Sequence, residues 1–416
     1  MAAVQQPARP ALREGALSGV RVVEFAVFAA GPVVGKLMAN YGAEVIRVES
    51  HTNPDGFRTH YPPFAGGTPG LDRSGCFALF NDGKLGVTLN LKVPAGVALA
   101  KRLVARADVV VENFTPGTIE RLGLGYEALR AVKPDLVMLS SCNMGQTGPY
   151  ARHPGFGSML SSLGGFTHLT GYPGELPLLN YGPYIDFIGA GYGLIAVLAA
   201  LDHRRRTGQG QHIDLAQYEC GLQFVIPALL DYVANGRLAE RAGNRSEHCA
   251  PQGAFPCRGD DAWCTISVTS DAEWEALRRA MGDPEWARDP AYATVLGRKA
   301  HEDAIEARLA EWTRQYTPRE LMALLQAAGV PAAAVNTMAD LYSDPQLAAR
   351  GFWQPLPHPA FGTFRYESGG FTLSETPQQP GLPSPCLGEH NEYVFRELLG
   401  LSAEEFADLR ERQVIY

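Results

Sequence analysis

The sequence lacks the cysteine patterns that mark disulfide-rich and zinc-binding proteins. Its 7 cysteines are scattered between Cys76 and Cys386, their number is odd, and no two of them form a C-x-x-C pair. Such a distribution predicts neither a disulfide framework nor a structural zinc site. We therefore expect no metal centre.

The chain also lacks an excess of positive charge and a long apolar run. With 36 Lys and Arg against 44 Asp and Glu, its net charge is −8 and its pI is about 5.7, which disfavours a general nucleic-acid-binding surface. A phosphorylated small molecule would have to bind in a local basic pocket. Residues 1–15 contain no apolar signal segment, and the uncharged run 187–201 is too short for a comfortable membrane span. We expect a soluble, cytoplasmic protein with no nucleic-acid and no membrane partner.

A glycine fingerprint for dinucleotides is absent as well. Predicted strands at residues 20–25 and 43–49 enclose a helix, and the second strand ends in Glu49, where dinucleotide-binding folds place a ribose-binding acid. The turn before the helix is Ala29-Ala30-Gly31-Pro32 in place of G-x-G-x-x-G, which disfavours NAD binding. The glycine-rich segment 189–193 follows no predicted strand, so close helix packing and close approach to a ligand both remain open.

Short strands and helices alternate in the first third of the chain. Pro32 fits the first turn of the first helix and Gly42 fits its end. In a chain of 416 residues, of which 46% are hydrophobic and 19% charged, this alternation predicts an α/β fold with a doubly wound parallel sheet and more than one domain. Further elements are expected at 86–91 (strand), 95–105 (helix), 108–112 (strand), 118–121 and 126–131 (short helices) and 135–140 (strand).

The pattern changes after residue 214. Residues 215–235 are amphipathic at nearly helical spacing, and no strand is expected after them. Farther on, Ser270 and Thr317 are each followed by a glutamate three residues later, as at the start of a capped helix. The segments that this predicts are a helical linker at 215–249, a small domain at 250–340, a return linker at 341–374 and a final helix at 402–412.

Asp186 is the one charged residue between Leu176 and Leu201. A carboxylate among apolar neighbours loses hydration, so it must be hydrogen-bonded, paired, or kept as a reactive group. A helix rich in small residues is expected from Phe187, and Asp186 then lies in its first turn, where backbone N–H groups and the helix dipole favour an anion. The segment alone therefore favours a helix cap, with a reactive carboxylate as the alternative.

Asn113 and Phe114 follow the strand expected at 108–112. The carboxyl ends of parallel strands form the edge at which open α/β sheets bind ligands, and there an amide could donate a hydrogen bond and a phenyl ring could stack. An ordinary turn shaped by Pro116 and Gly117 explains the same residues. Taken alone, the turn is the simpler interpretation.

Six segments match a known family in their order and spacing. They are residues 17–25 (LSGVRVVEF), 30–32 (AGP), 41–49 (YGAEVIRVE), 111–114 (VENF), 145–150 (GQTGPY) and 205–214 (RRTGQGQHID). With them the chain resembles the class III CoA-transferases, the family of formyl-CoA transferase and carnitine CoA-transferase that also contains the α-methylacyl-CoA racemases. The resemblance is specific from residue 17 to about 214 and looser from there to the C-terminus.

This resemblance implies a Rossmann-like large domain at 1–214, completed by about 375–416, and a smaller α+β domain joined to it by the two linkers. It also implies that two chains interlock as a homodimer. Coenzyme A or acyl-CoA is then a substrate, with no permanently bound cofactor. The family's nucleophile, an aspartate ahead of a small-residue helix, falls on Asp186. The CoA contacts of the family fall on Phe28, Ala29, Ala30, Leu89, Lys92, Asn113, Phe114 and Arg121.

The activity that the resemblance implies is transfer of CoA from an acyl-CoA donor to a small carboxylic acid, through aspartyl anhydride and aspartyl-CoA thioester intermediates. A carboxylate nucleophile suits this reaction, because the mixed anhydride lies energetically close to the thioester. A 2-methylacyl-CoA racemase and a non-catalytic CoA-binding protein are the alternatives. Racemases carry a His-Asp pair where this chain has Phe156-Gly157, so a two-base proton exchange lacks a partner.

The acids that exchange CoA are less well defined. Family analogy alone suggests succinate as the donor acid. Five loop residues could line the pocket of the acceptor, although residues of these types in loops are more often simply solvated: Arg58, His60, His153, His168 and Tyr172.

Overall fold

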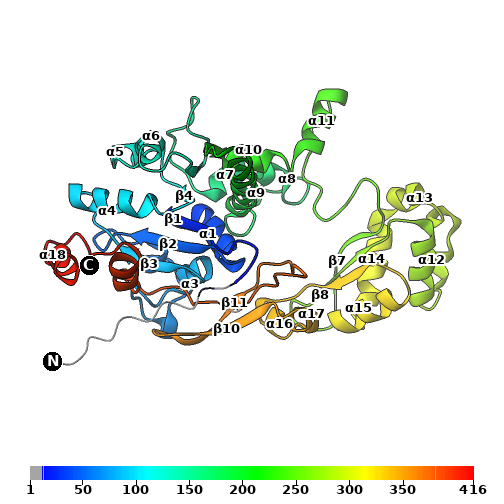
Figure 1. Ribbon diagram of the computed structural model, residues 1–416. Helices are drawn as coiled ribbons and strands as arrows, with labels where there is room; N and C mark the ends of the chain where they lie inside the picture. The colour runs from blue at the N-terminus through cyan, green and yellow to red at the C-terminus, as the bar shows by residue number, and fades with distance from the viewer. Residues whose placement is uncertain (1–11, 13, 380) are drawn as a thin grey trace. The chain divides into compact units, whose positions relative to one another are not determined.

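The computed structural model describes residues 12, 14–379 and 381–416 and contains two compact units (Figure 1). Unit 1 comprises the described residues of the ranges Met1–Phe166, Leu179–Val233 and Ala348–Tyr416, and unit 2 comprises Thr167–Leu178 and Ala234–Leu347. Three stretches that are far apart in the sequence therefore build unit 1.

Unit 1 is built on a six-stranded sheet with the order β3-β2-β1-β4-β5-β6, in which every neighbouring pair is parallel. The predicted doubly wound α/β fold is confirmed. The order reverses between β1 and β4, which creates the switch point at which such sheets bind ligands. The strands are β1 (Arg21–Phe25), β2 (Glu44–Glu49), β3 (Leu85–Thr88), β4 (Val109–Glu112), β5 (Val137–Cys142) and β6 (His212–Ala216).

Helices cover both faces of this sheet, because alternate residues of a strand point to opposite sides. Val23 packs in one buried cluster with α4 (Pro94–Val104), whereas Val22 packs in another with α1 (Ala30–Asn40) and α9 (Tyr184–Thr207). The remaining helical segments of unit 1 include α2 (Gly56–Thr59), η1 (Ala65–Gly67), α3 (Gly75–Asn81), α5 (Thr118–Arg121), α6 (Tyr126–Arg130), α7 (Gly157–Leu163), η4 (Tyr393–Leu398) and α18 (Ala403–Glu411).

The 24-residue helix α9 packs in the same buried cluster as α1, on one face of the sheet. By length and composition it is the one helix of the described residues that could cross a membrane, yet here it packs against α1, α7, α10 and β5. A Cβ at Gly193 would lie 3.2 Å from side-chain atoms of Val34 and Leu139, so this glycine permits close packing on the sheet. At the other end, Arg204 Nη2 binds Asp108 Oδ1 at 2.8 Å, which fixes α9 to the start of β4.

The segment expected as a helical linker at 215–249 begins in the sheet instead. Leu215 belongs to β6, and two helices follow, α10 (Gln217–Leu222) and α11 (Ile226–Asn235). In β6 the inward-facing Ile213 and Leu215 alternate with exposed polar residues. This short edge strand is stabilised by pairing with β5, a long-range contact that no local pattern reveals.

The stretch 341–374 contains a β-hairpin instead of an extended linker. β10 (Trp353–His358) pairs antiparallel with β11 (Gly362–Glu367), and the side chains of Leu356 and Tyr366 are buried in a small apolar cluster. Two prolines in β10 conceal this strand at the sequence level, because proline is depleted in strands.

Unit 2 has a three-stranded antiparallel sheet, β7-β8-β9, packed with helices around the buried Trp274. Both expected helix starts are found: the Ser270 hydroxyl accepts from the Glu273 N–H, and Thr317 forms a full capping box with Glu320. The elements, with the two short helices that follow β9, are β7 (Gln252–Pro256), β8 (Trp263–Ser267), α12 (Asp271–Ala280), η2 (Glu285–Arg288), η3 (Pro290–Tyr292), α13 (Val295–Ala300), α14 (Glu302–Thr313), α15 (Pro318–Ala327), β9 (Ala332–Ala334), α16 (Met338–Tyr342) and α17 (Pro345–Ala349); α8 (Phe166–Leu169) lies at the boundary of the units.

Candidate active site

A cavity of about 410 Å³ opens at the carboxyl ends of β1 and β4, the switch point of the sheet. Its walls come from the turns after β1, β4 and β5, from the start of α10 and from the first turn of α9. Its lining residues include Val27, Phe28, Ala29, Ala30, Asn113, Phe114, Thr118, Cys142, Asn143, His153, Phe156, Asp186 and Gln217. Six of the nine residues predicted for the site therefore meet in one cavity.

Asp186 reaches this cavity from the first turn of α9. Its Oδ2 atom is buried against Gly157, the first residue of α7, and has no hydrogen-bond partner among the described residues. Burial raises the pKa of Asp186 to about 6, and a hydrogen bond from its own backbone N–H opposes this increase. A raised pKa together with an unpartnered oxygen in a cavity makes this carboxylate a candidate reactive group.

The turn between β1 and α1 is held from two sides. The Asn113 side chain accepts a hydrogen bond from the Val27 N–H and donates one to the Val27 carbonyl, both at 2.8 Å. The next residue, Phe28, has φ of +59° and donates its N–H to Asp55 Oδ2 at 3.0 Å. Helix α1 then begins at Ala30 without a side-chain cap. A helix N-terminus with free N–H groups therefore lines the cavity and can bind an anion.

Phe114 is positioned by the buried carboxyl group of Glu112. The Phe114 N–H donates to Glu112 Oε2 at 2.9 Å, and Ser140 forms a second hydrogen bond with this carboxyl group. Burial raises the pKa of Glu112 to about 7. The phenyl ring of Phe114 packs partly on the core and partly lines the cavity, where it can contact a flat ligand group.

A separate basic groove of about 580 Å³ lies at the start of α4. Among the residues that the structure describes, three cations line it, Lys92, Lys101 and Arg121, and no acidic residue does. Arg121 Nη2 donates to Thr118 Oγ1 at 2.8 Å, and Thr118 also lines the cavity that contains Asp186. Such a set of cations suits phosphate groups.

Leu89 is the predicted contact that lines neither the cavity nor the groove. Its side chain is 1% exposed and packs in the core. Any contact with CoA would therefore have to come from its backbone.

Of the residues suggested for the acceptor, His153 lines the cavity. The suggestion for Arg58 is wrong, because its guanidinium is buried in ion pairs with Glu49 and Asp72. His60 Nδ1 is hydrogen-bonded to the neighbouring Thr59 hydroxyl. His168 and Tyr172 belong to unit 2, where Tyr172 lines a different cavity.

Sequence patterns missed several residues that line these sites. Gln217 follows β6, and recognising that strand would have placed it at the carboxyl edge of the sheet. A Cβ at Gly189 would lie 2.9 Å from Gln217 Cγ, so this glycine serves close helix packing. Lys101 resembles any exposed helix lysine until the fold places it beside Lys92.

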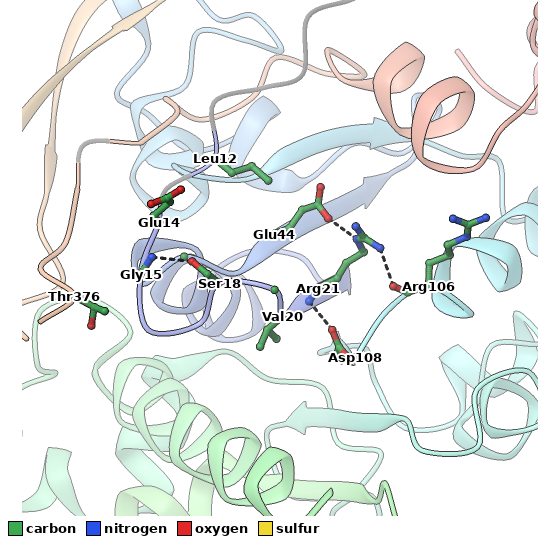
Figure 2. Close-up of a pocket in the computed structure, with 12 residues that line it drawn as sticks. Leu12, Glu14, Gly15, Ser18, Val20, Arg21, Glu44, Arg106, Asp108 and Thr376 are labelled. Carbon is green, nitrogen blue, oxygen red and sulfur yellow. Dashed lines mark hydrogen bonds and ion pairs between the residues drawn. The ribbon is translucent and has the colours of Figure 1, made fainter. Parts of the chain in front are cut away.

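A larger cavity of about 730 Å³ lies at the opposite edge of the sheet (Figure 2). There the Arg21 side chain binds Glu44 and the Arg106 carbonyl, and the Arg21 N–H donates to Asp108. These groups bind one another at the amino ends of the strands, away from the edge where open α/β sheets bind ligands.

The chain is similar to known proteins over most of its length. A model of the CoA-transferase family III matches residues 17–391. The chain is 37% identical over 412 residues to the succinyl-CoA–D-citramalate CoA-transferase of Chloroflexus aurantiacus, with 99% of each chain covered. It is 34% identical over 387 residues to the succinate–glutarate CoA-transferase of Agrobacterium fabrum, with 93% of this chain and 96% of the other covered.

The fold is shared with solved structures. A CaiB/BaiF family protein from Brucella suis superposes with a TM-score of 0.84 at 35% identity, covering 93% of this chain and all of the other. A protein of Mycobacterium tuberculosis superposes with a TM-score of 0.76 at 27% identity, covering 92% of this chain and 99% of the other.

Proposed function

The chain belongs to CoA-transferase family III and is a CoA-transferase, and from this premise we propose that Asp186 is the nucleophile that carries the transferred group. The observation that carries the proposal is the Asp186 carboxyl group, which lies in the switch-point cavity with a raised pKa and an unpartnered oxygen. A pKa of about 6 leaves most of this group ionised at neutral pH, as a nucleophile requires.

The first half of the reaction loads CoA onto the enzyme. The Asp186 carboxylate attacks the carbonyl carbon of the donor thioester, the C–S bond breaks, and CoA leaves as a thiolate from a mixed anhydride. The thiolate then attacks the Asp186 carbonyl of this anhydride. The donor acid leaves as a carboxylate, and an aspartyl-CoA thioester remains.

The second half reverses these steps with another acid. The acceptor carboxylate attacks the aspartyl thioester and expels the thiolate, which forms a second anhydride. Attack of the thiolate on the acceptor carbonyl gives the new acyl-CoA and restores Asp186. Each step exchanges one acyl bond for another of similar energy, so the sequence is reversible and needs no metal or redox cofactor.

The turn at Ala29 and Ala30 would stabilise the tetrahedral intermediates. Their carbonyl oxygens become negatively charged, and the uncapped N-terminus of α1 supplies backbone N–H donors beside them. A preorganised donor of this kind typically contributes about 3 kcal/mol to catalysis.

The CoA moiety would extend from this cavity to the basic groove. Lys92, Lys101 and Arg121 suit its phosphate groups, and Phe114 offers a ring face for the adenine. The Arg121–Thr118 hydrogen bond connects the walls of the two sites.

Succinyl-CoA is the donor that we propose first. Relatives from Chloroflexus aurantiacus and Agrobacterium fabrum act on succinyl-CoA or succinate. Incubating the purified protein with succinyl-CoA and a panel of mono- and dicarboxylic acids should form new acyl-CoA esters, detected by mass spectrometry. Failure to exchange CoA between any donor and acid of the panel would contradict the proposal.

An interlocked homodimer is the assembly that we propose. Apolar side chains are exposed on α9 and α11, among them Ile195 at 65% and Val233 at 75%. A second chain would bury such surfaces. Sedimentation at nanomolar concentration should show a dimer, whereas a folded monomer would contradict this assembly.

A further inference from the structure

One buried carboxylate near the site takes no part in the proposed chemistry. Asp55 is 2% exposed and immediately precedes α2. Its Oδ1 accepts a hydrogen bond from the Phe57 N–H at 2.7 Å, and its Oδ2 accepts one from the Phe28 N–H at 3.0 Å. The same side chain therefore caps α2 and holds the turn that leads into α1.

Phe28 needs such a restraint. Its φ of +59° is uncommon for a bulky residue, and a conformation of this kind persists only where the surrounding structure fixes it. The ring packs edge-on against Phe57 with centroids 5.3 Å apart, and a Cβ at Gly56 would lie 2.5 Å from its Cε1 atom. Both the backbone and the ring of Phe28 are thus fixed by residues 55–57.

Asp55 is itself held by buried charges. Arg47, which is fully buried, donates to Asp55 Oδ2 and to Glu24 Oε1. Lys84 donates to both carboxylate oxygens of Glu24, at 3.0 and 2.9 Å. This network fixes the position of the Asp55 carboxylate, because movement of any one member would leave a buried charge without its partner.

We infer that Asp55 is a positioning residue for CoA transfer: by holding the Phe28 N–H, it fixes the left-handed turn and directs the N–H groups of Ala29 and Ala30 at the reacting carbonyl. Asp55 acts through the turn and does not touch substrate. The inference rests on the proposed function, in which the acyl group is bound at Asp186.

Asp55→Asn tests the role of this contact. The variant has one carbonyl oxygen for the three donors that the carboxylate serves, which are the N–H groups of Phe28 and Phe57 and the Arg47 guanidinium. It also lacks the negative charge, so the hydrogen bond from the Phe28 N–H is weakened. The expected result is a fall in kcat of at least about tenfold, with KM for acyl-CoA and Kd for CoA within about twofold of wild type.

Asp72→Asn is the matched control. Asp72 accepts from Arg58 and from the Leu387 N–H in the adjoining part of the same charge network, and it has no contact with the turn. This variant should keep wild-type kcat. Equal losses of kcat in the two variants would overturn the inference, since they would reflect a general effect of the charge network.

Counting active sites separates positioning from folding. Hydroxylamine added with donor acyl-CoA converts an aspartyl thioester to a hydroxamate, and kcat is then expressed per labelled site. A kcat per labelled site equal to that of wild type in Asp55→Asn would overturn the inference. A label on a residue other than Asp186 would instead overturn the proposed nucleophile.

The Phe28→Gly background gives a second test. Glycine adopts a positive φ without strain, so Asp55→Asn should lower kcat less in this background than in the wild type. The same loss in both backgrounds would contradict action through the turn. If Asp55→Asn does not fold, Asp55→Glu keeps the charge beside Arg47 while shifting the acceptor, and it should show the same selective loss of kcat.

Discussion

The Asp186 carboxylate occupies the space that a side chain at Gly157 would need. The Asp186 Oδ2 atom lies 1.8 Å from the position that a Cβ at residue 157 would take. The orientation of the Asp186 carboxylate therefore depends on the absence of a side chain at residue 157, the first residue of the neighbouring helix α7.

Gly157→Ala should displace the Asp186 carboxylate, because a methyl group would overlap Oδ2. A misplacement of about 1 Å can lower kcat about 100-fold, and we expect a loss of this size with unchanged Kd for CoA. Gly191→Ala on α9 is the control, since no atom lies within 4 Å of its Cβ position. The measurement is kcat of the two variants in steady-state kinetics. Full activity of Gly157→Ala would contradict the inference that Asp186 needs this space for its carboxylate.

Asp186→Asn should abolish transfer, because an amide cannot form the anhydride. The variant should still fold and bind CoA, as measured by circular dichroism and calorimetry. In the wild-type protein, hydroxylamine with donor acyl-CoA should leave a hydroxamate about 15 Da heavier on the peptide that contains Asp186. Appreciable activity of the Asn variant would rule out this nucleophile.

Activity should depend on ionisation of Asp186. Its pKa of about 6 in the free enzyme predicts that kcat/KM falls about tenfold per pH unit below this value and is level above it, until other groups titrate. The profile should be recorded at subsaturating acyl-CoA over pH 4.5 to about 8. A profile that is level down to pH about 4.5 would show that the essential group has an ordinary carboxyl pKa.

Stability should show the opposite dependence on pH. The pKa of Asp186 is raised from 3.8 to about 6, so the unfolded chain releases its proton first and the wild type loses stability as pH rises between these values. The difference in Tm, Asp186→Asn minus wild type, should therefore increase over this range. Asp202 on the same helix has its pKa lowered from 3.8 by hydrogen bonds from Arg205 and Arg206, so the Tm difference for Asp202→Asn should be nearly level over this range and should change only below pH about 3.8.

Lys101→Ala should weaken binding of the CoA phosphates without slowing the chemistry. Loss of one charge-assisted contact predicts a KM for acyl-CoA about tenfold higher, with kcat within about twofold of wild type. Arg130→Ala is a suitable control, because Arg130 is an exposed cation of α6 outside the groove. An unchanged KM in Lys101→Ala would remove this groove from the CoA site.

The strands at the centre of the sheet could be predicted from sequence because burial on both faces requires continuous apolar runs such as Val109–Glu112, most of it valine. β6 and the β10–β11 hairpin could not, since half of their residues are polar or proline and their stability comes from partners distant in the chain. Patterns within a short stretch of sequence do not reveal strand pairing of this kind.

In the candidate site too, some residues could be predicted from the sequence and others could not. Asp186 is conspicuous in the sequence because an isolated carboxylate in an apolar stretch requires a reason. Asp55 is not, because its importance arises from Phe28, which lies 27 residues earlier and meets it only in the folded chain. Likewise, Gln217 can be predicted to line the cavity only if β6 is first recognised as a strand.

The anchoring of α9 has a consequence for how new specificities could be engineered. The helix is attached to the start of β4 by the Arg204–Asp108 ion pair and packs closely on the sheet at Gly193. The position of Asp186 is therefore set by the scaffold, which consists of the sheet and α9. The wall that contains His153 and Phe156 belongs to the loop before α7. We therefore expect that the sequence of this loop can be varied to accept other acids, while the scaffold keeps the proposed nucleophile, Asp186, in the same position.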